Sequence, residues 1–153
     1  MRWRIGKPRS VVAEVQNLLD AYPIDDNSAA LIEFESGALS SLDTSWAHRA
    51  GPNPYEFYGT EGYMGYNTWP GGGLFVNSTR VQAERIQGTI GPTPMPAAVP
   101  GPLDQWIGAT LHRTEMTITV EDGPNLTELL DGIYTSAREG REIRFADPVG
   151  DAN

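Results

Sequence analysis

The segment SWAHRAG, residues 45–51, holds the densest group of side chains in this sequence that could bind a small molecule. It places Trp46, His48 and Arg49 next to one another at the end of a predicted strand. Loops at strand ends on a rigid sheet often carry binding groups, so these three residues form the candidate binding site. A tryptophan that ends a strand is more often a packing residue, and any binding there is expected to be weak.

Two adjacent acids, Asp25 and Asp26, could supply a carboxylate pair for acid–base chemistry. A solvated turn ahead of a strand is the simpler interpretation of such a pair. His48 and His112 are the only histidines, and neither has a further ligand type at metal spacing. A metal site needs three or four converging ligands, so none is expected here.

Sequence motifs for catalysis or cofactor binding are missing from the chain. It has no G-x-S-x-G nucleophile turn and no G-x-G-x-x-G between a strand and a helix. The glycine-rich segments GTEG and PGGG lack the lysine and the following helix of a phosphate-binding loop. The sequence therefore assigns no catalytic and no cofactor-binding residue, and no cofactor is expected on this chain.

Composition limits the class of protein. A chain of 153 residues with 39% hydrophobic residues is long enough for one globular domain with its own core. It has no cysteine, which excludes disulfides and thiolate chemistry. The net charge of −9 argues against nucleic-acid binding, which requires clustered basic residues. No apolar run approaches the about 18 residues of a membrane span, and no signal peptide opens the chain, so a cytoplasmic protein is expected.

Alternating apolar residues predict an antiparallel sheet with one covered face. The predicted strands span residues 11–16, 28–34, 38–46, 55–59, 63–67, 74–77, 80–86 and 141–145. Three hairpins are expected: one turns at Gly37 and one at Gly62, and the third joins 74–77 to 80–86.

Helices are predicted late in the chain, at residues 103–111 and 124–139. In the second helix, Leu126, Leu129, Leu130 and Ile133 form an apolar stripe that should pack on the sheet, and Gly140 ends the helix. Strands followed by helices indicate an α+β class, with an open, mainly antiparallel sheet and helices packed on one face. One domain over residues 1–147 is expected, followed by a tail at 148–153.

Four segments, in this order and spacing, carry a family resemblance: RWRIGKPRSVVAEV, DDNSAALIEFESGALSSLDTSW, EFYGTEGYMGYN and DGPNLTELLDGIYTSAREGREI. Together they resemble the C-terminal domain of the Gfo/Idh/MocA family of NAD(P)-dependent oxidoreductases. The first resembles a helix end, a Gly-x-Pro stop and the first strand of the sheet. The others resemble the central hairpin, the GTEG hairpin and the final helix.

The resemblance implies a sheet that closes the floor of a sugar or polyol site and forms a homo-oligomer through its open face. Family members begin with a Rossmann domain and a Glu-Lys-Pro motif, and this chain starts after both. No family catalytic residue therefore maps onto a position here. NAD or NADP is implied for a full-length relative, and this chain by itself is expected to be inactive. Any sugar should bind weakly near Trp46, His48 and Arg49.

Three functions stay open at this point. The first is the substrate-binding and oligomerisation domain of a sugar or polyol oxidoreductase, catalytically incomplete as this chain. The second is a stand-alone, non-enzymatic small-molecule-binding or scaffold domain of the same fold. The third is an unrelated α+β enzyme whose site the sequence does not reveal. The upstream coding sequence would separate the first two.

Overall fold

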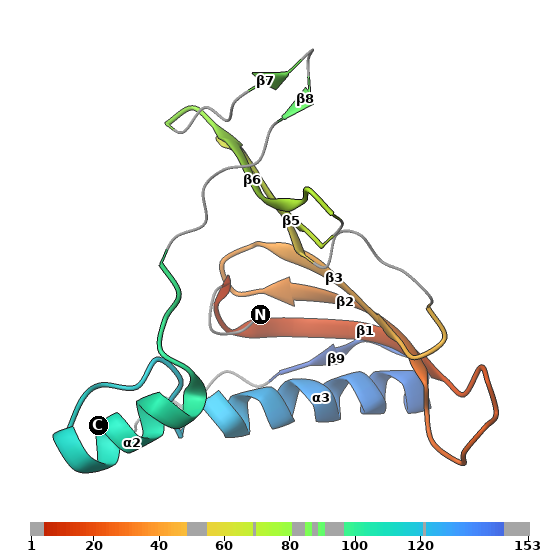
Figure 1. The fold of residues 1–153 in the computed structure, drawn as a ribbon. Coiled ribbons are helices and arrows are strands. Elements are labelled where there is room, and N and C mark those ends of the chain that lie inside the picture. Colours follow the sequence, from red (N-terminus) through yellow and green to blue (C-terminus); the bar gives the residue numbers. More distant parts are fainter. Residues whose placement is uncertain are drawn as a thin grey trace, which may run out of the picture. The chain divides into compact units, whose positions relative to one another are not determined.

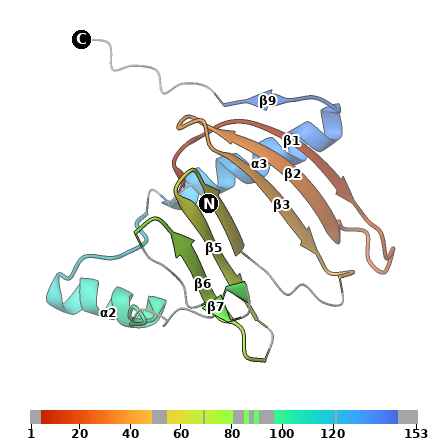
Figure 2. The same ribbon diagram turned by 90° about the horizontal axis from the view of Figure 1, so that it is seen from above.

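The computed structural model describes residues 5–48, 55–68, 70–80, 85–86, 89–90, 97–120 and 122–145. The chain divides into two compact units (Figures 1 and 2). The first unit consists of Met1–His48 and Leu103–Asn153, and the second of Arg49–Pro102. The expectation of a single domain over residues 1–147 with a tail at 148–153 stays a prediction.

The first unit is built on a four-stranded sheet in the order β3-β2-β1-β9. Its strands are β1 (Pro8–Gln16), β2 (Asn27–Phe34), β3 (Leu39–Ser45) and β9 (Ile143–Arg144), and every neighbouring pair is antiparallel. The β2–β3 hairpin turns at Gly37, whose φ of 82° favours glycine, as the sequence predicts. The predicted α+β class with an open antiparallel sheet is confirmed.

Helix α3 (Asp122–Glu139) lies along one face of this sheet (Figures 1 and 2). Alternate strand residues point toward it because side chains on a strand alternate between faces. The resulting core consists of Val11, Ala13, Ala30, Ile32, Phe34, Leu129 and Ile133. The apolar face that the sequence predicts on β1 and β2 is therefore confirmed.

The predicted helix stripe was wrong at two of its four positions. Leu129 and Ile133 are buried, but Leu126 is 57% exposed and Leu130 is 44% exposed. The buried face of α3 instead includes Gly132, where an added Cβ would lie 2.6 Å from the Phe145 ring. Small residues therefore occupy the centre of the contact, and the helix approaches the sheet closely. A search for apolar spacing alone misses such a face.

Ser136 links the helix to the first strand. It is fully buried, and its Oγ accepts the Ala13 N–H at 3.0 Å and donates to the Arg141 carbonyl at 2.7 Å. β9 pairs with β1 only at Ser10 and Val11, so the Ala13 N–H lies beyond the paired part of β9. The serine hydroxyl takes the place of a strand neighbour there and satisfies a buried donor.

The second unit contains a three-stranded antiparallel sheet, β4-β5-β6, and a separate pair of short strands. These strands are β4 (Tyr55–Gly59), β5 (Gly62–Asn67), β6 (Gly73–Ser78), β7 (Arg85–Ile86) and β8 (Thr89–Ile90). The predicted hairpin between 55–59 and 63–67 is confirmed, but the predicted turn at Gly62 is wrong. Gly62 is the first residue of β5, pairs with Gly59 and has no positive φ, so the turn lies at residues 60–61. The hairpin expected between 74–77 and 80–86 is wrong, because β6 pairs with β5 and β7 pairs with β8.

Helix α2 (Pro102–His112) matches the helix predicted at 103–111 and has no buried residue. Asp104 in its first turn and His112 in its last turn suit the helix dipole. Within the described part of the chain, no helix is both long enough and apolar enough to cross a membrane.

Candidate functional site

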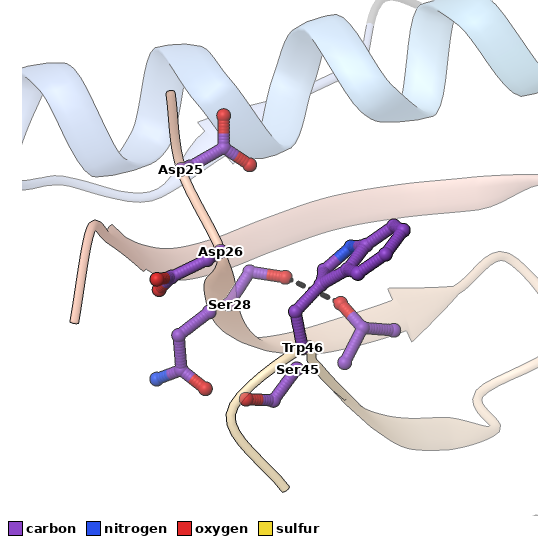
Figure 3. Close-up of a pocket in the computed structure, with 7 residues that line it drawn as sticks. Asp25, Asp26, Ser28, Ser45 and Trp46 are labelled. Carbon is purple, nitrogen blue, oxygen red and sulfur yellow. Dashed lines mark hydrogen bonds between the residues drawn. The ribbon is translucent and has the colours of Figure 1, made fainter. Parts of the chain in front are cut away.

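A polar pocket of about 340 Å³ opens at one edge of the four-stranded sheet (Figure 3). It forms where β2 begins and β3 ends, because the antiparallel register pairs Asn27 with Ser45 and Ser28 with Thr44. The Trp46 N–H donates to the Asp26 carbonyl at 2.8 Å and extends this pairing beyond the strands. The lining residues are Asp25, Asp26, Asn27, Ser28, Thr44, Ser45 and Trp46.

Asp26 organises the loop that leads into the pocket. Its Oδ1 accepts the Leu18 N–H at 2.7 Å and its Oδ2 accepts the Leu19 N–H at 2.8 Å. In the same loop the Asn17 side chain accepts the Asp20 N–H, which helps hold Asp20 at a φ of 52°. Both oxygens of Asp26 are therefore engaged with backbone, as expected of a residue that builds a turn.

Asp25 is held by a side chain of helix α3 rather than by the backbone of the loop. The Tyr134 hydroxyl donates to its Oδ2 at 3.0 Å across 109 positions of sequence. The hydrogen bond to this carboxylate raises the pKa of Tyr134, and partial burial and the negative charge of Asp25 raise it further. The two aspartates thus differ: Asp26 supports the backbone, whereas the carboxylate of Asp25 is oriented by a side chain.

The remaining lining combines hydroxyl groups with one aromatic ring. The Ser28 and Thr44 hydroxyl oxygens lie 2.7 Å apart across the strand pair, in hydrogen-bond contact (Figure 3). The Ser45 hydroxyl accepts the Ala47 N–H at 3.0 Å. The Trp46 side chain is 89% exposed, so its ring is accessible for stacking. Such a lining can present hydrogen bonds and an aromatic face to a polyhydroxylated molecule.

The three residues that the sequence predicts as a site are not brought together as a group. Trp46 lines the pocket. His48 does not line it, and its Nδ1 lies 4.0 Å from Asp43 Oδ1. Arg49 lies outside the described residues. That these residues bind a substrate stays a prediction.

Sequence reasoning missed the role of Asn27, Ser28, Thr44 and Ser45, which join the aspartates and Trp46 in the pocket. The register of the β2–β3 hairpin could have revealed them. A turn centred on Gly37 brings the residues around 27 opposite those around 45. In the described residues no group of three or more His, Asp or Glu side chains is placed to hold a metal.

The fold and the pocket define an α+β sheet domain with a polar, partly aromatic site at a sheet edge. By sequence, residues 1–64 match the GFO/IDH/MocA C-terminal domain. This match, with the fold similarity below, confirms the resemblance to the C-terminal domain of the Gfo/Idh/MocA oxidoreductase family. No curated protein matches the sequence significantly.

Solved oxidoreductases share the fold over nearly the whole chain. An oxidoreductase from Agrobacterium radiobacter, solved with NAD+, L-tartaric acid and magnesium, is 20% identical over 94% of this chain, with a TM-score of 0.71. GenD2 from gentamicin A biosynthesis, solved with NAD, is 27% identical over 95%, with a TM-score of 0.67. The aldose-aldose oxidoreductase from Caulobacter crescentus, solved with glycerol, is 20% identical over 91%, with a TM-score of 0.64. This chain spans only 45%, 44% and 42% of their respective lengths.

Proposed function

We propose that this chain is the substrate-binding and assembly domain of an NAD(P)-dependent oxidoreductase that acts on a sugar or polyol. The observation that carries the proposal is the fold match to oxidoreductases solved with NAD or glycerol, which extends over more than nine-tenths of the chain. The pocket supports it, because hydroxyl, carboxylate and indole groups converge on one side of the sheet.

Cofactor binding is assigned to another part of such an enzyme. The pyrophosphate of NAD binds at a helix N-terminus that follows a strand in a parallel βαβ unit. Every strand pair that the structure describes is antiparallel, so the described residues do not fit this cofactor. The chain would contribute the floor of the sugar site, with Trp46, His48 and Arg49 near the bound ligand.

The assembly role is assigned to the open face of the four-stranded sheet. Val12 and Leu31 pair across β1 and β2 on this face and are 49% and 65% exposed. Leu39, which is 81% exposed, pairs with Glu33 on the same face. Exposed apolar side chains on one sheet face favour association with a second copy. A homo-oligomer is therefore part of the proposal, and a cytoplasmic location is proposed with it from the sequence alone.

One expectation about this face changes with the structure. The sequence predicts Ser40, Thr44 and Trp46, mixed with acidic residues, on the open face. The register pairs Ser40 with Ile32 and Thr44 with Ser28, which places both on the face that α3 covers. The open face carries Ser41 and Asp43 instead.

Light scattering tests the assembly role. It should show at least a dimer for the wild-type protein, and Leu31→Glu should yield monomers. A monomeric wild-type protein would contradict the assembly role.

Calorimetric titration tests the substrate role. We expect glycerol, inositol or glucose to bind weakly, in the millimolar range, and NAD and NADP not to bind. Trp46→Ala should abolish sugar binding. Trp106→Ala, which removes an exposed tryptophan of α2 outside the pocket lining, should leave it unchanged. Saturable binding of NAD at micromolar concentration, or no binding by any sugar or polyol, would contradict the proposal.

A further inference from the structure

The charge of the pocket is unbalanced. Two of its seven lining residues, Asp25 and Asp26, are acids, and none is a lysine, arginine or histidine. The Asp26 carboxylate already accepts two backbone N–H groups, which partly compensates its charge. An anionic ligand would meet two carboxylates, and none of the described lining residues supplies a cation to offset their repulsion. His48 and Arg49, which the proposed function places near the ligand, are not among these lining residues. The pocket therefore disfavours acidic ligands such as sugar acids.

Asp25 is the carboxylate best placed to receive a cation. The Tyr134 hydroxyl occupies its Oδ2. Among the residues that the structure describes, none donates a hydrogen bond to its Oδ1. A carboxylate that is oriented by one donor and has a second oxygen available is suited to a charge-assisted hydrogen bond from an ammonium group. Tyr134 is thereby a positioning residue, because it acts on the ligand only through Asp25.

Trp46 adds a second preference for positive charge. The face of an indole attracts a cation electrostatically, and tryptophan does so more strongly than the other aromatic residues. Its ring is almost wholly exposed and belongs to the same pocket as Asp25 (Figure 3). The Asp25 carboxylate, which precedes β2, and the Trp46 indole, which follows β3, thus both favour a positively charged ligand group.

The rest of the lining suits the hydroxyl groups of a sugar. Asn27, Ser28, Thr44 and Ser45 present neutral groups that both donate and accept hydrogen bonds. The cavity volume of about 340 Å³ lies at the lower end of the range typical of small-molecule sites. It is suited to a ligand of about one or two sugar rings rather than to a polymer.

We propose that this pocket binds an aminosugar, a polyhydroxylated ligand with a protonated amine, in preference to neutral sugars and sugar acids. The amine contacts the Asp25 carboxylate and the face of the Trp46 ring, and the hydroxyl groups of Ser28, Thr44 and Ser45 contact the sugar hydroxyls. The sugar part of this ligand rests on the proposed function, whereas the preference for an amine rests on the pocket alone.

Calorimetry with three matched ligands tests this preference: glucosamine, glucose and glucuronate. At about pH 6 and low salt the amine is protonated and the carboxylates are ionised. An exposed ion pair and a cation–π contact together predict binding of glucosamine about tenfold tighter than that of glucose. Glucuronate should bind most weakly of the three.

Variants assign the preference to its residues. Asp25→Asn should reduce the ratio of glucosamine to glucose affinity severalfold, because the ion pair is lost; this ratio, rather than the affinity for glucose, is the readout. Tyr134→Phe keeps the Asp25 charge but loses its orientation, so an intermediate ratio is expected. Asp131→Asn is the matched control, since it removes one acidic charge from an exposed position of α3 outside the pocket lining.

The outcomes separate this inference from the proposed function. Equal affinity for glucosamine and glucose, or tightest binding of glucuronate, would overturn the aminosugar preference and leave the sugar site standing. A preference that Asp131→Asn abolishes as strongly as Asp25→Asn would also overturn it, because net charge would then be responsible. Absence of binding by all three ligands would overturn both proposals.

Discussion

The sheets of the two units differ in how much of their surface is buried. In the first unit, α3 covers one sheet face, and the strands facing it contribute five buried apolar residues: Val11, Ala13, Ala30, Ile32 and Phe34. In the second unit, Gly65 is the only buried residue among those whose burial is described. The register of β4 and β5 puts Tyr58 beside Tyr63 on one face and Phe57 beside Met64 on the other. Large side chains thus lie on both faces of this sheet, and neither face is buried.

This difference separates two sources of stability. The first unit is stabilised by apolar burial against a helix, which is the dominant favourable term in folding. The second unit depends more on its backbone ladder and on local contacts, such as the tilted ring pair of Tyr58 and Tyr63 at 5.1 Å. A two- or three-stranded sheet without a covered face is only marginally stable. We therefore expect the second unit to open more readily.

The largest effect should come from the core of the first unit. Leu129→Ala removes a side chain that is 5% exposed and should lower the free energy of unfolding by about 2–5 kcal/mol. Leu130→Ala is the matched control on the same helix and should cost about 1 kcal/mol or less, since that residue is 44% exposed. Urea unfolding followed by circular dichroism measures both. Equal losses would mean that the helix packs on a different face.

A smaller effect is expected from the buried serine that joins α3 to β1. Ser136→Ala leaves the Ala13 N–H without its acceptor and should cost about 1–3 kcal/mol. Thr127→Ala is the control: it removes an exposed hydroxyl that donates to the Gly123 carbonyl of the same helix, and it should change stability little. Urea unfolding of the two variants gives the comparison. A neutral Ser136→Ala would show that water or a shift of the backbone satisfies Ala13.

The sequence predicts the first unit better than the second for a physical reason. One-sided burial imposes a period of two on β1 and β2, and that pattern is visible in residues 11–15 and 30–34. The buried face of α3 was harder to predict, because Gly132 and Ser136 at its centre are not residues that a search for periodic apolar side chains would find. β7 and β8 are only two residues long, so their pairing could not be predicted from alternation.

The candidate site was only partly predictable. Trp46 is recognisable as an aromatic residue at a strand end. Its neighbours in the pocket come from the start of β2, and only the register of the hairpin brings them to it. Tyr134 contacts Asp25 from a position 109 residues away, which no local pattern shows. The sequence shows the residue types of the pocket, but it does not show which distant residues the fold brings together.

The pairing of β5 with β6 at Gly62 sharpens the comparison. A Cβ at Gly62 would lie 2.7 Å from the Ser78 Cα, so Gly62→Ala forces β5 and β6 apart. We expect a loss of about 1–3 kcal/mol that is confined to this sheet. Hydrogen exchange should show weaker protection in residues 62–78 and unchanged protection in residues 10–15 and 28–34. Equal loss of protection in both units would show that they unfold together.

The smallest effect concerns two tyrosines, one in each unit. Partial burial and a hydrogen bond to Glu56 raise the pKa of Tyr63, and a hydrogen bond to Asp25 raises the pKa of Tyr134. A raised folded-state pKa stabilises the fold fully below the unfolded value, near 10.0, and this stabilisation is lost as pH rises through the folded value. Tyr134→Phe should therefore cost about 0.5 kcal/mol or less at neutral pH, since the pair is exposed. The difference should vanish in strongly alkaline solution, which urea unfolding at several pH values would detect.

The central proposal is that this chain provides a sugar site and that the cofactor binds elsewhere in the enzyme, and chemical-shift mapping by NMR tests it most directly. On addition of glucose or glucosamine, we predict amide shifts concentrated at residues 25–28 and 44–46, the two strand ends that form the pocket. On addition of NAD or NADP, we predict no saturable shifts. Saturable shifts with either nucleotide, or sugar-induced shifts that leave both strand ends unchanged, would contradict the proposal.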